Sequence, residues 1–395
     1  MTVTSLGSPD DALSEAAAPS STRERGAVSA WVPIWLWGVA LLVILMVLVG
    51  GATRLTGSGL SITQWRPVTG ALPPLSTADW AAEFARYRES PQYQLLNAGM
   101  SLADFQSIYW WEWGHRQLGR FIGLVYAGFF LFGLVRRGFP FATGVKLALM
   151  GLLLGFQGLI GWVMVASGLK PGMTAVEPVD LAAHLLFASL FLATLVAMAT
   201  ASGARARVAA AESRTASGIP RKAAILSRLL LALILLQLVL GALVAGAHAG
   251  LIYNSWPSMD GHFAPSLREL FAASPWFANF FENVSLIQLD HRLGAYLVTA
   301  VALWNAVLWR HAADRGLARL AAALAGLVLA QAALGIVTLL YAVPLAAALS
   351  HQLFAMLVLA LAVRFATLAH LPHRRATSPA PYEGERPLAA HVATR

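Results

Sequence analysis

Four of the ten histidines stand at matching positions in two similar halves of the chain: His115, His184, His291 and His351. Two histidines on neighbouring helices can bind one metal ion, and imidazole suits iron, copper, zinc and nickel. Two protein ligands are too few for a closed zinc site, but they fill both axial positions of a heme iron inside a helix bundle. The pattern favours one heme site in each half. The alternative is four structural histidines that hydrogen-bond neighbouring helices.

A sequence repeat defines these halves. At a constant offset of 191 residues, Gly50 matches Gly241 and Trp65 matches Trp256. The same order of matches continues with Gly59 and Gly250, Gly70 and Gly261, Pro74 and Pro265, His115 and His291, Gln157 and Gln331, Gly161 and Gly335, and His184 and His351. Each half contains an even number of apolar stretches, so both halves run in the same direction. We therefore expect a parallel repeat with a pseudo-two-fold axis along the membrane normal.

An acidic residue distinguishes the first half from the second. Glu112 stands three residues before His115, whereas the corresponding residue before His291 is Gln288. On a helix, residues three apart share a face, which would point Glu112 and His115 into one pocket. A carboxylate there could relay protons or stabilise a developing positive charge; the alternative is a solvated glutamate at the membrane edge. We predict the reaction site in the first half, at Glu112, His115 and His184, and a bis-histidine electron-transfer site in the second.

Arginines follow two of these histidines directly. Arg116 and Arg292 could pair with heme propionates through charge-assisted hydrogen bonds, or could instead be helix-end side chains that extend to the membrane surface. Arg54, just beyond the first apolar stretch, is a further candidate for the same role. We interpret the other histidines as surface groups: His248, His262, His311, His370, His373 and His391.

The elements that must position these residues are membrane-spanning helices, which need about 20 mostly apolar residues each. The sequence predicts an all-α integral membrane protein with eight spans, arranged as two four-helix bundles. The spans are expected at 33–53, 117–135, 144–164, 181–201, 227–247, 292–309, 318–340 and 347–367. Each of the four histidines would then lie near the start of an even-numbered span, close to one membrane face.

Lys and Arg gather in one set of connections, which the positive-inside rule places in the cytoplasm together with both termini. The long connections 54–116 and 248–290, and the heme sites, are therefore expected at the outer face. We expect disordered tails at 1–30 and 368–395, an N-terminal half at 31–201, a cytoplasmic linker at 202–226 and a C-terminal half at 227–367.

Composition excludes several classes of protein. The chain is 58% hydrophobic and only 12% charged, which is typical of a membrane protein. It has no cysteine, which excludes disulfides, iron–sulfur clusters and thiolate ligands. The net charge of +9 lies mostly in short loops between apolar stretches. We therefore interpret the positive charge as the signal that orients the helices in the membrane, and we expect no nucleic-acid partner.

These residues resemble the heme A synthase family over roughly 33–367. The resemblance rests on the eight spans, the duplication and four motifs: the stretch 50–61 (Gly-Gly-Ala-Thr-Arg-Leu-Thr-Gly-Ser-Gly-Leu-Ser), 112–116 (Glu-Trp-Gly-His-Arg), 290–292 (Asp-His-Arg), and His184 with His351. The resemblance implies oxidation of the C8 methyl group of heme O, through an alcohol, to the formyl group of heme A, with water as the oxygen source. It implies that His115 and His184 border the iron of the substrate heme, that Glu112 is essential, and that His291 and His351 ligate the iron of heme b.

Many bacterial members of the family carry a cysteine pair in an external loop, so this chain resembles the cysteine-free branch of proteobacteria and mitochondria. The resemblance further implies a bacterial inner membrane location. The partners expected with it are heme O and heme A, heme O synthase, assembly factors of terminal oxidases, membrane lipids and further copies of the chain.

Two other functions fit parts of the pattern. A diheme b-type cytochrome that moves electrons between quinone and a partner would also use two bis-histidine sites, but it would not need Glu112. A transporter would need ionisable residues or broken helices near the middle of the membrane. The candidate ligands instead gather at one face, which disfavours the transporter.

Overall fold

The computed structural model describes residues 28–210, 221–312 and 314–370, and within these ranges the chain forms helices and no strand. Eight helices are long and apolar enough to cross a membrane. They are α1 (Trp31–Leu55), α4 (Leu102–Val135), α5 (Phe141–Gly168), α6 (Pro178–Ala210), α7 (Arg221–Gly246), α10 (Val284–Trp309), α11 (Arg315–Leu340) and α12 (Leu345–His370). Each contains one of the eight predicted spans, apart from one residue at the end of the fifth, so the prediction of an all-α protein with eight membrane-spanning helices is confirmed.

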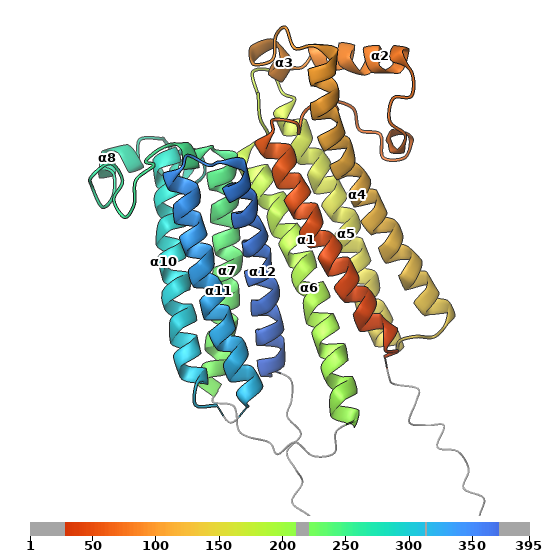
Figure 1. Cartoon of the computed structure of the whole chain (residues 1–395), viewed down its shortest axis with the longest axis vertical. Helices are drawn as coiled ribbons and strands as arrows, with labels where there is room; N and C mark the ends of the chain where they lie inside the picture. Colours follow the sequence, from red (N-terminus) through yellow and green to blue (C-terminus); the bar gives the residue numbers. More distant parts are fainter. Residues whose placement is uncertain (1–27, 211–220, 313, 371–395) are drawn as a thin grey trace, which may run out of the picture.

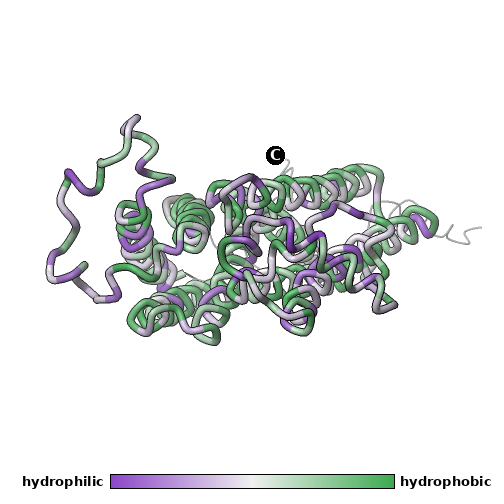
Figure 2. The backbone as a smooth tube through the Cα atoms, turned by 90° about the horizontal axis from the view of Figure 1, so that it is seen from above, coloured by the Kyte–Doolittle hydropathy of each residue, from purple (hydrophilic) through white to green (hydrophobic). Residues whose placement is uncertain are grey.

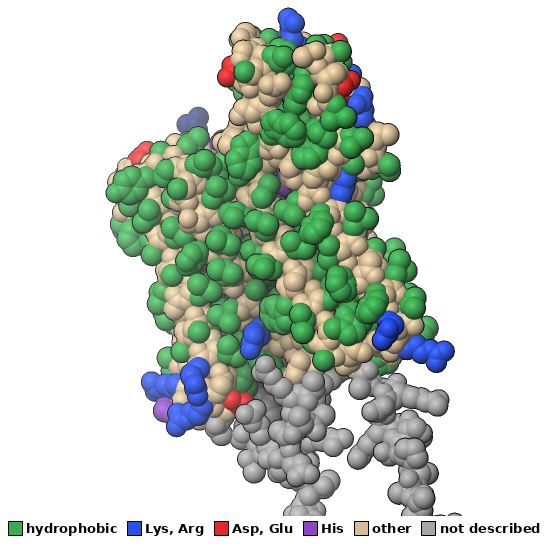
Figure 3. Space-filling view, turned by 45° about the vertical axis from the view of Figure 1, so that its right-hand side comes forward, with side chains coloured by type: hydrophobic (Ala, Val, Ile, Leu, Met, Phe, Trp, Pro, Cys, Tyr) green, Lys and Arg blue, Asp and Glu red, His purple; other side chains and the backbone are tan. Residues whose placement is uncertain are grey.

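Apolar sequence and capping residues explain these helices. Ser101 accepts a hydrogen bond from the Asp104 amide, and the Asp104 side chain accepts from the Ser101 amide, which forms a capping box at the start of α4. Asn283 and Asp314 cap α10 and α11 in a similar way. Large apolar side chains such as Leu124 and Leu152 are exposed along the helices, and Figure 3 shows this hydrophobic belt between two charged ends. A lipid environment would cover that surface.

The helices pack with the same set of neighbours in each half (Figure 1). In the first half α1 contacts α4 and α6, and α5 contacts α4 and α6; in the second, α7 contacts α10 and α12, and α11 contacts α10 and α12. The halves meet where α6 contacts α7 and α12 and where α1 contacts α12. The order of contacts matches the sequence repeat, and the axis that relates the halves stays a prediction.

The two long connections lie at the same end of the molecule (Figure 1). The first contains η1 (Thr69–Ala71), α2 (Thr77–Arg88) and α3 (Pro91–Leu95); the second contains η2 (Ala249–Leu251), α8 (Leu267–Leu270), η3 (Trp276–Ala278) and α9 (Asn279–Glu282). Figure 2 views the molecule from above, along the helices, and shows many of its hydrophilic residues on the connections between helices. Tyr87 of α2 packs with Phe105 and Tyr109 of α4, which anchors the first connection.

One predicted boundary is wrong: α4 begins at Leu102, and the connection expected at 54–116 ends fifteen residues earlier than predicted (116 − 101). The segment 102–116 is rich in aromatic and charged residues, so hydropathy alone does not mark it, but the capping box starts the helix there. As a result His115 lies well inside α4. Helices also continue into the predicted linker 202–226, because α6 ends at Ala210 and α7 begins at Arg221. Most of both predicted tails lies outside the described residues.

Candidate heme-binding cavity

All eight candidate site residues line one continuous cavity of about 1610 Å³. In the first half these are Arg54, Glu112, His115, Arg116 and His184; in the second they are His291, Arg292 and His351. The cavity exceeds the roughly 300–1,000 Å³ that is typical of small-molecule pockets, so it has room for a group as large as a porphyrin. The sequence predicted two separate sites, whereas the structure joins the two regions through the contact between the halves.

Each candidate histidine lies against a glycine of the preceding spanning helix. His115 of α4 faces Gly50 of α1, and the same relation joins the other three pairs: His184 and Gly161, His291 and Gly241, His351 and Gly335. A Cβ atom added at Gly335 would lie 2.8 Å from Cε1 of His351, and the other three glycines are similarly close at 2.8–3.1 Å from an imidazole atom. The absence of a side chain at these glycines therefore makes room for each imidazole ring.

We expect Gly335→Ala to displace the His351 ring and to lower the heme content of the purified protein severalfold, because ordinary Cβ contacts are longer than 3.0 Å. Gly326→Ala on the same helix is the matched control, since a Cβ there meets nothing within 4 Å. Heme absorbance per mole of protein measures the effect. Equal heme content in both variants would contradict the expectation that His351 binds heme in the orientation that Gly335 allows.

Glu112 is buried, at 2% exposure, in the first-half wall of the cavity. Its Oε1 accepts from Arg116 at 2.6 Å, while its Oε2 accepts from the Ser61 hydroxyl and the Ile62 amide, both at 2.8 Å. These donors fix the position of the carboxylate group. The burial contradicts the alternative of a solvated glutamate at the membrane edge. The helix runs through this segment, so Glu112 and His115 share a face as the spacing predicted.

The second half places a neutral side chain at the matching position. Gln288 accepts from Arg292 at 3.0 Å and donates to the main-chain oxygens of Ala249 and Ile252. Arg292 also donates to the main-chain oxygens of Tyr253 and Ser258, much as Arg116 donates to those of Ile62 and Gln64. Both arginines therefore connect one of the long connections to a spanning helix, and only the first half adds a carboxylate to this contact.

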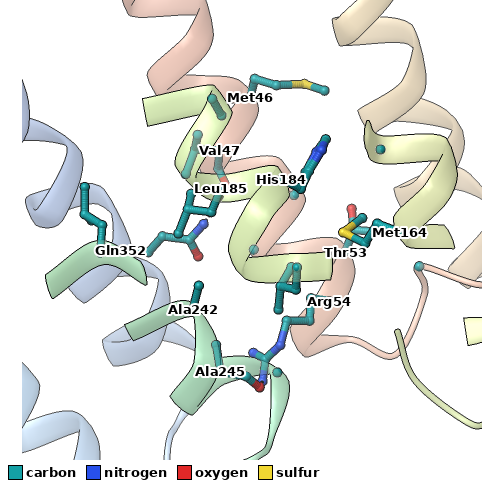
Figure 4. A pocket seen from close by; sticks show the side chains of 18 of the residues that line it. Met46, Val47, Thr53, Arg54, Met164, His184, Leu185, Ala242, Ala245 and Gln352 are labelled. Atoms are coloured by element: carbon teal, nitrogen blue, oxygen red, sulfur yellow. Dashed lines mark hydrogen bonds between the residues drawn. The ribbon is translucent and has the colours of Figure 1, made fainter. Parts of the chain in front are cut away.

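The Arg54 side chain, at the end of α1 in the first half, contacts α7 of the second half. Its guanidinium donates to the main-chain oxygen of Ala245 near the end of α7, as Figure 4 shows. Among the described residues it has no carboxylate partner. Gln352 of α12 makes the converse contact and donates to the Val47 oxygen of α1 at 2.6 Å. A cationic group without a counterion on the cavity wall is suited to an anionic group of a ligand.

His248 is exposed, as predicted, and it also borders the cavity beside Arg54. Partial desolvation of the ring, and then the positive charge of Arg54, lower the pKa of His248. His262 and His311 are exposed as predicted, His370 is partly buried and bonds the Ala366 oxygen, and His373 and His391 lie outside the described residues.

Sequence reasoning missed one group of residues. Gln157, Gln237 and Gln331 line the cavity, and each places its amide nitrogen within hydrogen-bond distance of one candidate histidine. Gln157 and Gln331 are repeat matches, which was the available signal. Gln237 has no such signal, because the matching residue of the first half is Met46.

The fold and the cavity define a class: a multi-span helical membrane protein whose two similar halves line one cavity with paired histidines. Comparison with known sequences agrees with this class. The chain belongs to the cytochrome oxidase assembly protein family, whose model matches residues 33–363.

The relatives it resembles are heme A synthases. It is 54% identical over 359 residues to the heme A synthase of Methylobacterium sp. (strain 4-46), which covers 90% of this chain and 96% of the relative. It is 47% identical to that of Azorhizobium caulinodans over 87% of this chain and 94% of the relative. It is 45% identical to that of Brucella ovis over 83% and 89%. The resemblance stated from the motifs is thereby confirmed.

Proposed function

We propose that this chain is a heme A synthase that oxidises the C8 methyl group of heme O, through the alcohol, to a formyl group. The observation that carries the proposal is a charge difference between two otherwise similar halves. Both halves line the cavity with paired histidines, but only the first places a buried carboxylate, Glu112, one helical turn from a histidine. The corresponding Gln288 is neutral.

The residues of the cavity fit an iron porphyrin. Four histidines provide two axial pairs, and four glycines leave space for their rings. The amide oxygens of Gln157, Gln237 and Gln331 and the Nδ1 atom of His351 are buried without a hydrogen-bond partner in the described part of the chain. Such atoms usually have a partner, and ligand binding that reorients the imidazoles would provide one. His291 and His351 would hold heme b, which supplies a one-electron redox centre when bound.

His115 and His184 would border the iron of the substrate heme O. Glu112, held in place by Arg116, Ser61 and Ile62, would stabilise the positive charge that develops as the methyl carbon is oxidised. Its four accepted hydrogen bonds favour this electrostatic role over a proton relay, because a relay needs a free lone pair. Water supplies the oxygen atom in this proposal. Each of the two oxidation steps, methyl to alcohol and alcohol to formyl, then releases two protons and two electrons, and an external electron acceptor would take up the electrons.

The arginines would hold the propionates. Arg54 has no counterion among the described residues, so a propionate would neutralise it. Arg116 and Arg292 already bond main-chain oxygens of the outer connections and would join propionates to those segments. We place the protein in a bacterial inner membrane with these sites near the periplasmic face, where heme O synthase and oxidase assembly factors are its expected partners.

The second candidate function is a diheme b-type cytochrome, which the similar construction of the two histidine pairs favours. A cytochrome would keep both hemes bound and would not change them. A synthase keeps one heme and exchanges the other.

Co-expression with heme O synthase tests the proposal. Pigments extracted from cells with the wild-type protein should contain heme A, and cells without it should contain heme O but no heme A. If heme O remains unconverted while the purified protein carries its full heme b, the synthase function is wrong and the cytochrome is favoured.

A further inference from the structure

Three of the four candidate ligands have a half-buried glutamine beside the ring. Nε2 of Gln157 lies 3.1 Å from Nδ1 of His184, and Nε2 of Gln237 lies 3.0 Å from Nδ1 of His291. Nε2 of Gln331 lies 3.4 Å from Nε2 of His351. In all three glutamines the amide oxygen is buried and has no hydrogen-bond partner within the described ranges.

Metal ligation explains why an acceptor is needed at these places. A neutral imidazole has one lone pair and one N–H, so a ring that binds iron through one nitrogen carries its proton on the other. That N–H needs an acceptor in a buried site. A glutamine amide that turns its unpartnered oxygen toward the ring would supply this acceptor. In Gln157 and Gln237 the turn would exchange it for the bond that Nε2 now donates to the main-chain oxygen of the same histidine, at 2.9 Å in both cases. Such outer partners fix the ring orientation and raise the basicity of the ligand.

The fourth histidine has no such partner. No hydrogen bond to the His115 ring is found among the residues that the structure describes. The repeat position that holds Gln237 in α7 holds Met46 in α1. The two side chains take similar paths: Met46 lies against Gly119 of α4, and Gln237 lies against Gly294 of α10. Figure 4 shows that Met46 and His184 border the same pocket. A thioether is only a weak acceptor. The His115 ring therefore lacks the strong hydrogen-bond acceptor that Gln237 could provide for His291.

We infer that Gln157, Gln237 and Gln331 position three of the histidines as iron ligands, and that Met46 makes His115 the labile ligand. The inference rests on the proposed function for the identity of the bound group. It explains why one heme would stay bound while the other is released, as the proposed function requires. The second half has two supported ligands and holds its heme, whereas the first half has one and releases its product.

A reciprocal exchange between the repeats tests this inference. In the purified protein, Gln237→Met should release the resident heme to a scavenger such as apomyoglobin about tenfold faster. It should also raise the reduction potential of that heme, because loss of the acceptor makes the imidazole a poorer donor. Gln237→Glu keeps an acceptor and should restore slow release. Met46→Gln should slow the release of heme from the first half by about tenfold.

Gln117→Met is the matched control, because Gln117 lies on α4, bonds the Ala71 oxygen and does not line the cavity. It should leave both release rates and the potential unchanged. Unchanged release rates in Gln237→Met and Met46→Gln, with heme bound as in the wild type, would overturn this inference and leave the proposed function intact. A protein that binds no heme would reject both. Met46→Gln keeps the test decisive if Gln237→Met does not fold.

Discussion

Replacing Glu112 with glutamine is expected to lower heme A formation about a hundredfold or more while the protein keeps its heme b. Glutamine has the shape of glutamate but no charge, and it is the residue that the second half carries as Gln288. The positive charge on the substrate would then lose its stabilising partner. Pigment extraction after co-expression with heme O synthase measures product, and the absorbance of the purified protein measures retained heme b.

Alanine would be a less informative substitution at this position. It would remove the acceptor that Arg116, the Ser61 hydroxyl and the Ile62 amide share, whereas glutamine keeps one amide oxygen there. Glu83→Gln is a suitable control, because Glu83 pairs with Arg66 and Arg86 on the outer connection and does not line the large cavity. Heme A levels near wild type in Glu112→Gln would show that the carboxylate serves only to anchor Ser61 and Ile62.

His291→Ala is expected to reduce the resident heme of the purified protein by at least about tenfold, since even loss of an outer partner of a ligand costs 10–100-fold in affinity. Heme A formation should fall with it, because the second-half redox centre is lost. Free imidazole in the growth medium should restore part of the absorbance, since it can enter the space that the ring vacates.

His262→Ala provides the comparison for His291→Ala, because His262 is exposed on the outer connection and outside the cavity. It should retain heme and activity. If His291→Ala retained the wild-type amount of heme with an unchanged spectrum, His291 would not be a ligand, and the assignment of heme b to the second half would be wrong.

Much of the fold could be predicted because a membrane-spanning helix is recognisable from one continuous apolar segment of the sequence. Runs of apolar residues predicted all eight spans. The repeat predicted that the two halves would have matching helix contacts, as they do. The start of α4 could not be read in this way, because residues 102–116 are aromatic and charged and are held by packing against Tyr87 of a distant segment. The end of a hydropathy window is therefore a poor guide where a helix extends beyond the membrane.

The candidate site was predictable in part. Repeat spacing identified the four histidines, and helical spacing placed Glu112 beside His115. The donors that hold Glu112 come from a connection about fifty residues earlier, so no local pattern reveals them. The glycines matched in the repeat, but only the structure shows that each one faces an imidazole. Gln237 was missed because a search for matches between the halves passes over a position where the halves differ.

The most direct measurement is the optical spectrum of the purified wild-type protein, compared with that of a His291→Ala, His351→Ala double variant, both made in cells with ample porphyrin. We expect a strong Soret band from low-spin heme in the wild type and its near-complete loss in the double variant. A colourless wild-type protein, or a spectrum that the double substitution leaves unchanged, would contradict the conclusion that paired histidines of the second half bind an iron porphyrin.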